Sequence, residues 1–478
     1  MTAIAFPMSS HPGERPPESS GRIINGFSQA LGQGNPSAIA HYRAPGIAPF
    51  YTSDETGFRG MTEINGIVYV AFNDRLLKGT AAGGALLPVG TGAFAGTEPV
   101  FFARNNAALP DQVVVSENGA HVYTPTSAPA SYPDSDLPQP VDVTFGLGFF
   151  FFAIANARCY ASGLNTTTIN PLDFATAEGK PDALKRVVFW SDRLYMLGDG
   201  SIEVWGTPIN ATGFPLSRMT VIPRGIAGAR CVCGHENGFD LGLFIVGNDN
   251  KVSTLEGYTP IPISTSEVER DIAAVSDKSD IEMSSYYVGG RPCIRIRCPS
   301  WTWVYDVQAK QWHERMSHLS VTSRSMATVY AYDKWLCGDT NSGDVGDIRE
   351  GVYTEWGQPL PWQVESVPPP SFPHPLTIRA ARFKFTGGVG NASGIDPIET
   401  DPHVMISWTD DGGNHWGYPV ARPLGRQALA SDVVVNRTGV TGSHGRRWRL
   451  VVVDPVHVCL MGGDMDMQLR APASRAAV

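Results

Sequence analysis

The sequence predicts an all-β protein in which a β-propeller of six or seven irregular blades is followed by a C-terminal β-sandwich-like domain. Three observations support this fold class. The chain of 478 residues contains 51 glycines and 37 prolines, which form turns and interrupt helices. Apolar residues rarely recur at helical spacing. Short apolar runs alternate with polar turns along most of the chain, as expected for a succession of β-hairpins.

The hairpin pattern begins near residue 60 and repeats at a spacing typical of propeller blades. Each repeat has two runs rich in β-branched and aromatic residues, which flank a short turn of Asn, Asp or Gly. The turns fall near residues 73, 117, 156, 199, 249, 308 and 341. A period of about 40–50 residues indicates a propeller. No Trp-Asp dipeptide recurs at a fixed phase, so a stack of unrelated hairpins is the alternative.

Composition divides the chain into three parts. Residues 1–50 are rich in Pro, Ser, Gly and Ala, and we expect either an extended arm that orders against a partner or disorder. Residues 51–355 are the expected propeller. Proline-rich stretches near the following boundary indicate a C-terminal β domain over residues 356–478, of which 471–478 should fray. Four runs in this domain read as strands of a sandwich: Ile378–Phe385, Val404–Trp408, Asp432–Val435 and Trp448–Val453.

The most apolar stretch is Phe145–Ala155, which contains four consecutive phenylalanines. It is shorter than the roughly 18–20 residues needed to cross a bilayer, so we interpret it as one buried strand. The first twenty residues lack a basic start followed by an apolar run, so no signal peptide is expected. We therefore expect a soluble protein, made in a cytoplasm, without a membrane-spanning segment.

Charge and cysteine content exclude several classes of protein. Acidic residues outnumber basic ones by 46 to 37, which argues against a protein that grips nucleic acid but allows a channel through which DNA passes. The seven cysteines are scattered and odd in number, which argues against a disulfide framework. Cys231 and Cys233 have no second pair at zinc-site spacing, so we expect two buried strand thiols.

The stretch Thr409–Trp416 fits the Asp-box pattern, which resembles the boxes of sialidases and of many non-enzymatic β proteins. In this interpretation Asp411 caps turn amides, Gly413 supplies an unusual backbone angle, and Trp416 packs beneath the turn. A sialidase would repeat the box and add an arginine cluster, a tyrosine nucleophile and an acid. Only one box is present, outside the expected propeller, so we expect it to be structural.

Other candidate sites are equally weak, and we predict no catalytic, cofactor-binding or metal-binding residues and no cofactor. The acidic loop Asp339–Asp347 lacks the terminal Glu of a calcium loop and is expected to be a hydrogen-bonded turn. No histidine pair has zincin spacing, and no glycine-rich loop ends in Gly-Lys-Ser/Thr. The densest basic cluster, Arg446–Arg449, suits either an anionic partner or, more simply, a charged strand edge.

Several short motifs occur in a consistent order: Arg43–Ile47, Thr168–Asp182, Leu194–Gly198, Ser201–Trp205, Phe214-Pro215, Arg224–Gly228, Val304–Asp306, Gln311-Trp312 and Cys337–Asp339. With these motifs the chain resembles the tail hub family of short-tailed bacteriophages, also called nozzle, tail accessory or packaged-DNA stabilisation proteins. The resemblance covers most of residues 40–460 and is most specific between residues 165 and 230. It carries no catalytic residue.

The resemblance implies a non-enzymatic subunit of the virion tail that assembles in the bacterial host cytoplasm. Its implied partners are other copies of itself in a homo-hexameric ring, the head-tail adaptor protein, and tail spike, fibre or needle proteins. DNA would pass through the ring's channel without tight binding, and the ring would retain packaged DNA. Two other functions are open: a carbohydrate-binding or sialidase-like propeller that recognises a receptor, and a cellular propeller scaffold.

Overall fold

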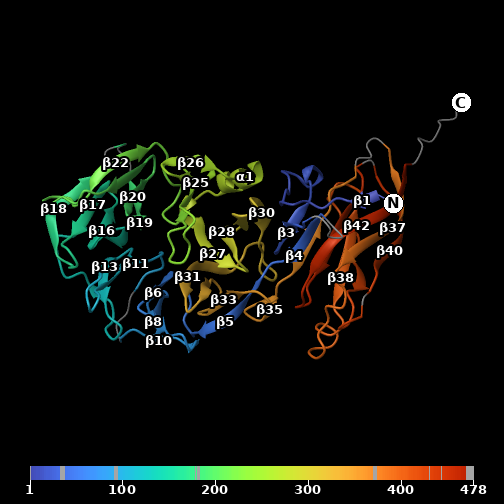
Figure 1. Ribbon diagram of the computed structural model, residues 1–478, viewed down its shortest axis with the longest axis horizontal. Coiled ribbons are helices and arrows are strands. Elements are labelled where there is room, and N and C mark those ends of the chain that lie inside the picture. Colours follow the sequence, from blue (N-terminus) through green and yellow to red (C-terminus); the bar gives the residue numbers. More distant parts are fainter. Residues whose placement is uncertain are drawn as a thin grey trace. The chain divides into compact units, whose positions relative to one another are not determined.

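The computed structural model describes residues 2–32, 38–90, 95–177, 179, 183–210, 212–369, 374–429, 431–442 and 444–469 (Figure 1). The chain divides into two compact units. The propeller unit comprises Pro49–Pro299 and Arg324–Ile348. The sandwich unit comprises Met1–Ala48, Ser300–Ser323 and Arg349–Val478. Strands dominate both units, and the described residues contain one α-helix, α1 (Ser266–Ala274).

The first five blades of the propeller unit are four-stranded antiparallel sheets, each made of strands that follow one another along the chain. The strands of these blades are β6 (Gly60–Ile64), β7 (Ile67–Ala71), β8 (Leu76–Gly79) and β10 (Leu87–Pro88); β11 (Phe101–Arg104), β12 (Gln112–Ser116), β13 (Gly119–Tyr123) and β14 (Ala130–Ser131); β15 (Asp142–Gly146), β16 (Phe149–Ile154), β17 (Arg158–Ser162) and β18 (Ile169–Thr176); β19 (Leu184–Trp190), β20 (Arg193–Gly198), β21 (Ile202–Gly206) and β22 (Ser217–Ile222); and β23 (Val232–Cys233), β24 (Phe244–Val246), β25 (Val252–Glu256) and β26 (Thr259–Pro262).

Two further blades complete the ring. The sixth contributes β27 (Glu282–Val288) and β28 (Arg291–Cys298) to this unit. The seventh consists of β31 (Ser325–Ala331), β32 (Lys334–Asp339), β33 (Val345–Arg349) and β5 (Gly46–Thr52), which precedes the first blade in the sequence. Because β31 packs against β6, the seventh blade is the neighbour of the first. The expected propeller is confirmed, with seven blades.

The phenylalanine-rich stretch is a hairpin, not the single strand expected from its apolar character. The chain reverses at Leu147 and Gly148, whose φ angles of 52° and 91° lie in the left-handed region. A two-residue turn of this kind suits the twist of a β-hairpin. Gly146 and Phe149 therefore lie opposite each other in the ladder between β15 and β16.

The same phenylalanines explain how neighbouring blades adhere. Successive side chains of a strand point to opposite faces of its sheet. Phe150 and Phe152 accordingly join the core shared with the second blade, whereas Phe151 joins the core shared with the fourth. All three are fully buried, and a blade with apolar residues on both faces holds its two neighbours in place.

The sandwich unit has two sheets around one core. The first sheet has the order β3 (Gly26–Ala30), β4 (Ile39–Arg43), β42 (Cys459–Leu469), β37 (Leu376–Phe385) and β40 (Val433–Val440), with β1 (Thr2–Ile4) also paired to β42. The second contains β29 (Trp301–Asp306), β30 (Gln311–Glu314), β2 (Arg22–Ile24), β36 (Trp362–Glu365), β41 (Arg447–Val452), β38 (His403–Thr409) and β39 (Val420–Pro423). A short hairpin, β34 (Thr354–Glu355) and β35 (Gln358–Pro359), completes the unit.

The division into units differs from the expected one in two places. Residues 1–50 are not an extended arm, because β1 to β4 pair within the sandwich sheets and Ile4 and Ile23 enter the sandwich core. Residues 300–323, expected within the propeller at 51–355, belong to the sandwich unit, as does the expected C-terminal domain 356–478. Residues 471–478, expected to fray, lie outside the described residues.

Across the described ranges, no helix has the length and apolar character needed to cross a membrane.

Candidate functional site

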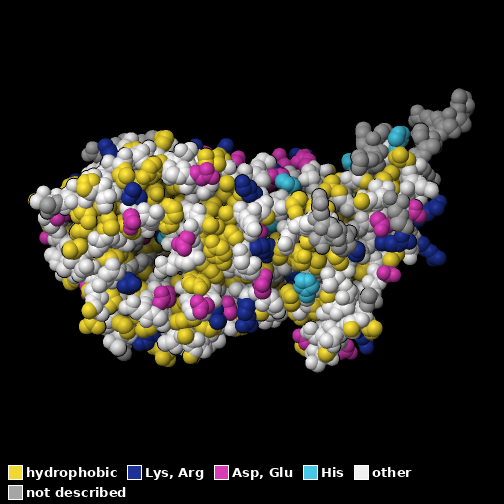
Figure 2. Space-filling view, in the orientation of Figure 1, with side chains coloured by type: hydrophobic (Ala, Val, Ile, Leu, Met, Phe, Trp, Pro, Cys, Tyr) yellow, Lys and Arg dark blue, Asp and Glu magenta, His cyan; other side chains and the backbone are white. Residues whose placement is uncertain are grey.

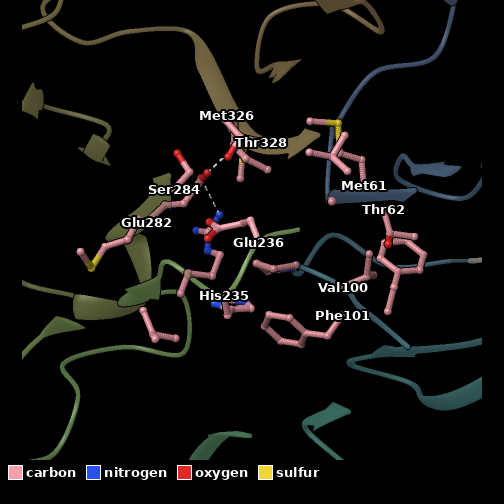
Figure 3. Close-up of a pocket in the computed structure, with 18 of the residues that line it drawn as sticks. Met61, Thr62, Val100, Phe101, His235, Glu236, Glu282, Ser284, Met326 and Thr328 are labelled. Carbon is pink, nitrogen blue, oxygen red and sulfur yellow. Dashed lines mark hydrogen bonds and ion pairs between the residues drawn. The ribbon is translucent and has the colours of Figure 1, made fainter. Parts of the chain in front are cut away.

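The first strand of every blade faces one central cavity of about 280 Å³, here called the axial cavity (Figure 3). In the close-up, Met61 and Thr62 lie on the side opposite Glu282 and Ser284. Propellers place their innermost strands around a central channel, so the fold itself brings these residues together. The seven blades contribute in turn Arg59–Glu63, Pro99–Phe102, Val143-Thr144, Arg186-Val187, Arg230 with Val232 and His235–Asn237, Glu282–Ser284, and Met326–Tyr330.

A buried ion pair joins the third and fourth blades beside this cavity. Arg186 Nε lies 2.9 Å from a carboxylate oxygen of Asp142, a fully buried residue. Burial raises the pKa of Asp142 to about 6, although Arg186 and the backbone N–H groups of Val187 and Val143 oppose the shift. The Arg186 guanidinium also lies over the Phe101 ring, 3.9 Å from its centroid. Arg186 therefore connects three consecutive blades.

Two further carboxylates connect the fifth, sixth and seventh blades. Arg230 Nη1 donates to Glu282 at 3.2 Å, and the other oxygen of Glu282 accepts the backbone N–H of Ala327. Glu236 accepts hydrogen bonds from the backbone N–H and the hydroxyl of Ser285, at 3.1 and 2.6 Å. Each carboxylate thus links two segments of neighbouring blades, and its negative charge is balanced by N–H and O–H donors of the cavity wall.

His235 lies at the same wall and is half-buried. Burial lowers the pKa of its imidazole to about 4, with Arg186 adding to the effect and Glu236 opposing it. One ring nitrogen lies 3.4 Å from Arg186 Nη2. The ring is therefore neutral near pH 7 and can accept a hydrogen bond from the arginine.

The ion pairs and hydrogen bonds around the axial cavity hold the blades together. Asp142, Glu236 and Glu282 are all engaged by donors of the protein, so none is positioned as an unengaged acid or base. In the part of the chain that the structure describes, no cluster of three or more His, Cys, Asp or Glu side chains could hold a metal. The sequence pattern did not single out Asp142, Glu236 and Glu282, because they come from three different blades and lie far apart in the sequence.

The comparison with protein families decides the identity. The sequence model of the phage stabilisation family, described as "Bacteriophage P22 Gp10, beta-propeller", matches residues 33–353, more than half of the chain. The chain belongs to this family. The match spans the propeller unit, and it confirms the resemblance expected from the ordered motifs. The chain is thus a phage tail stabilisation protein with a β-propeller.

Other comparisons add less about this family member. No curated protein matches the chain. Among solved structures, BamB from Moraxella catarrhalis is 12% identical, with a TM-score of 0.39, over 69% of this chain and 98% of that one. The computationally designed Ika8 protein is also 12% identical, with a TM-score of 0.38, over 72% of this chain and 98% of that one.

The Asp-box lies in the sandwich unit and forms the tight turn expected of it. Asp411 accepts the backbone N–H of His415 at 3.0 Å and the Thr409 hydroxyl at 2.7 Å. Burial would raise the pKa of Asp411, but these hydrogen bonds and the His415 side chain hold it well below its usual range. Gly413 has a φ of 101°, in the left-handed region that glycine favours.

The acidic loop near residue 340 is also a hydrogen-bonded turn. The fully buried Asp339 forms a two-nitrogen ion pair with Arg324 and accepts the backbone N–H of Asn341 at 3.0 Å. It also accepts the Ser342 hydroxyl at 2.5 Å. With its oxygens engaged in this way, Asp339 acts as the centre of the turn.

All seven cysteines are buried, and none of them forms a disulfide. Burial raises the pKa of Cys231 to about 12 and that of Cys233 well above its ordinary value. Because the thiolate is the reactive form, the C-x-C pair behaves as two inert core residues.

The basic cluster Arg446–Arg449 is largely neutralised by acidic side chains. Arg446 forms a two-nitrogen ion pair with Asp410, with both distances 2.8 Å. Arg447 and Arg449 both pair with Glu365 on the neighbouring strand β36. The cluster is therefore more than a charged strand edge, and two of its members line a second cavity described below.

Proposed function

We propose that this protein is a non-enzymatic tail hub or nozzle subunit. Six copies form a ring below the head-tail adaptor, continue the DNA exit channel, retain packaged DNA and anchor spikes or fibres. Assembly takes place in the bacterial cytoplasm. Membership of the phage stabilisation family is the observation that carries this proposal.

The size of the axial cavity supports a channel that runs through the ring and not through each propeller. About 280 Å³ is just below the usual volumes of small-ligand pockets, about 300–1,000 Å³. A DNA duplex has a major groove about 12 Å wide and cannot enter such a space. Ion pairs between the blades oppose any widening of the cavity. The DNA path is therefore expected between subunits.

Exposed apolar residues on the outer strands of the blades support side-to-side contacts. Leu172 on β18, Met219 on β22 and Ile261 on β26 are 78%, 45% and 39% exposed. Outer strands also carry unpaired backbone groups along their free edges. A closed ring needs head-to-tail contacts of this kind between unlike faces of neighbouring subunits.

The charge of the chain supports a channel wall that does not hold DNA. Tight binding without sequence preference needs several Lys or Arg contacts to phosphates. Acidic residues outnumber basic ones here, and in Figure 2 the dark-blue basic side chains are interspersed with magenta acidic ones on the face in view.

Electron microscopy tests the hub. Virions, or adaptor mixed with this protein, should show six copies around the tail axis, whereas a single copy bound at the periphery would contradict the proposal. Purified protein should bind duplex DNA weakly at physiological salt; nanomolar affinity with a steep salt dependence would contradict the non-binding channel. Turnover of a sialoside or glycan, abolished by one Asp or Tyr substitution, would contradict the non-enzymatic assignment.

A further inference from the structure

A second cavity lies wholly within the sandwich unit and joins three distant parts of the sequence. Its volume is about 180 Å³. Its walls are the segment 12–22, the Asp-box turn at Gly413 and Trp416, and the strands β36 and β41 through Glu365, Arg447 and Arg449. We call this cavity the arginine pocket.

Positive charge exceeds negative charge in the walls. Four guanidinium groups, those of Arg15, Arg22, Arg447 and Arg449, line the pocket with two carboxylates, those of Glu14 and Glu365. The excess is two charges, from four minus two. Arg22 also pairs with Glu314, which lies outside the lining, and counting Glu314 leaves an excess of one. A negatively charged group is therefore favoured in the pocket.

The single negative charge of Glu365 is already shared between two arginines of the pocket. Arg449 Nε and Nη2 lie 2.9 and 2.8 Å from one oxygen, to which Gln363 also donates at 3.0 Å. Arg447 Nη2 donates to the other oxygen. Glu365 is 1% exposed and so holds the two arginines in fixed positions.

Arg447 carries a buried donor that has no partner among the residues that the structure describes. Its Nη1 donates to the carbonyl oxygens of Pro16 and Gly412, and its Nη2 donates to Ser19 and Glu365. Its Nε is buried without a hydrogen-bond acceptor. A buried donor without a partner is costly, so an acceptor that enters the pocket would be favoured.

The Asp-box gives the pocket an aromatic wall. The Arg449 guanidinium lies over the Trp416 ring, 3.7 Å from its centroid, and that of Arg447 lies 5.7 Å away. Stacking of this kind fixes the plane of a guanidinium group, and in Arg449 it holds the Nε and Nη2 edge against Glu365. The turn held by Asp411 therefore has a second consequence, because it places Trp416 against the arginines.

We propose that the arginine pocket binds an Asp or Glu side chain from an acidic segment of another protein in the assembly. A carboxylate accepts charge-assisted hydrogen bonds from guanidinium N–H groups, and the buried Nε of Arg447 is one such donor. The pocket is smaller than the usual space for a whole small-molecule ligand, and this size suits one side chain. A carboxylate has one negative charge and is repelled less by Glu14 and Glu365 than the more highly charged phosphate. This inference does not depend on the proposed ring.

Fluorescence anisotropy with a labelled ten-residue peptide of alternating Glu and Ser tests the site on the full chain. Arg449→Gln should weaken binding about tenfold, the loss expected for a charge-assisted hydrogen bond. Arg15→Gln changes an exposed residue that the fold does not require, and it should weaken binding about threefold. Arg426→Gln is the matched control, because Arg426 is exposed and pairs with Asp401 away from the pocket. It should change affinity less than twofold.

Three outcomes would overturn the inference. The first is equal weakening by Arg426→Gln, which would indicate attraction by net charge alone. The second is equal binding of a peptide with Gln in place of Glu. The third is a 20-base-pair duplex or inorganic phosphate that binds more tightly than the peptide and loses this advantage in Arg449→Gln. That result would assign the pocket to phosphate.

Discussion

The propeller unit and the sandwich unit are both built of strands, but they differ in the sequence separation of the strands that pair. Most pairs in the propeller unit are close in sequence, whereas many pairs in the sandwich unit are far apart. The first five blades pair only strands that follow one another. In the sandwich unit, Thr2 lies opposite Met465, and Ile24 lies opposite Glu314. Distant pairing costs more loop-closure entropy and delays folding. The comparison teaches that most of the propeller can form blade by blade, whereas the sandwich needs residues from almost the whole chain.

One buried charged residue from each unit shows the same contrast in sequence separation. In the propeller unit, Asp142 is buried against Arg186 of the next blade. In the sandwich unit, the buried Arg43 donates to the carbonyl oxygens of Leu360, Val453, Asp454 and Val456. Charge in the propeller joins neighbours, whereas Arg43 joins residues more than 300 positions apart.

The largest expected effect concerns β5, the strand of the seventh blade that lies far in sequence from its partner β33. Tyr51 on β5 is fully buried, packs edge-on against Phe50 and donates its hydroxyl to Thr80 at 2.7 Å. Tyr51→Ala should destabilise the propeller unit by about 3–5 kcal/mol, as for other large-to-small core substitutions. Urea unfolding should show one transition shifted and the other unchanged. Tyr418→Ala, at an exposed position, is the control. An equal shift of both transitions would mean that the units unfold as one.

Arg43→Met should have a similar but smaller effect on the sandwich unit. It would leave buried carbonyl oxygens without a donor, at a cost of about 3 kcal/mol. The same urea experiment should now shift the other transition. Arg426→Met removes an exposed arginine of the same unit and should leave the sandwich transition at the same urea concentration. A shift of the propeller transition by Arg43→Met would contradict the assignment of Arg43 to the sandwich.

Acidification should change the stability of the two units differently, because their buried titratable groups differ. Burial lowers the pKa of His41 in the sandwich unit to about 4, below the ordinary value of 6.5. The unfolded chain therefore binds more protons between these values, and stability is lost as pH falls from about 6.5 to 4. The loss is about 3 kcal/mol, and His41→Asn should abolish most of it.

In the propeller unit the corresponding shifts oppose one another. The pKa of His235 is lowered to about 4, so acidification removes stability through this group. The pKa of Asp142 is raised to about 6, so its contribution to stability grows as pH falls through 6. We expect a flatter pH profile for the propeller transition. A loss equal to that of the sandwich would contradict the pairing of these opposite shifts.

Asp411→Ala should have the smallest effect, because Asp411 is partly exposed. Loss of the hydrogen bonds from His415 and Thr409 should destabilise the sandwich unit by about 1 kcal/mol. The melting temperature of the sandwich unit measures this loss of stability. His415→Ala is a matched control that keeps the Asp411 carboxylate. An unchanged melting temperature in Asp411→Ala would show that the turn does not need this side chain.

The propeller was predictable from sequence because its signals are local. A strand, a polar turn and another strand lie within about twenty residues, as in Val113–Tyr123. The prediction was wrong at Leu147-Gly148, where an apolar leucine occupies a left-handed turn position that pattern rules assign to Asn or Gly.

The sandwich was only partly predictable because its signals are distant. The strand β42 was missed, since Gly462, Gly463 and two aspartates interrupt its apolar pattern. The N-terminal strands were missed because those of Ile4 and Ile23 are only three residues long and their partners lie far along the chain. The candidate sites share this property. The axial cavity draws charged residues from separate blades, and the arginine pocket draws on segments more than 400 residues apart.

The position of β5 has a consequence for synthesis. About 290 residues separate Thr52 from Val345, where its partner strand β33 begins. At about 5–20 residues per second, translation leaves β5 without that partner for about 15–60 s. An unpaired strand edge is a template for pairing with other chains. β5 contains Pro49, which has no backbone N–H to donate. This proline makes the waiting strand a poor template, so one residue protects the nascent chain from aggregation until the seventh blade closes.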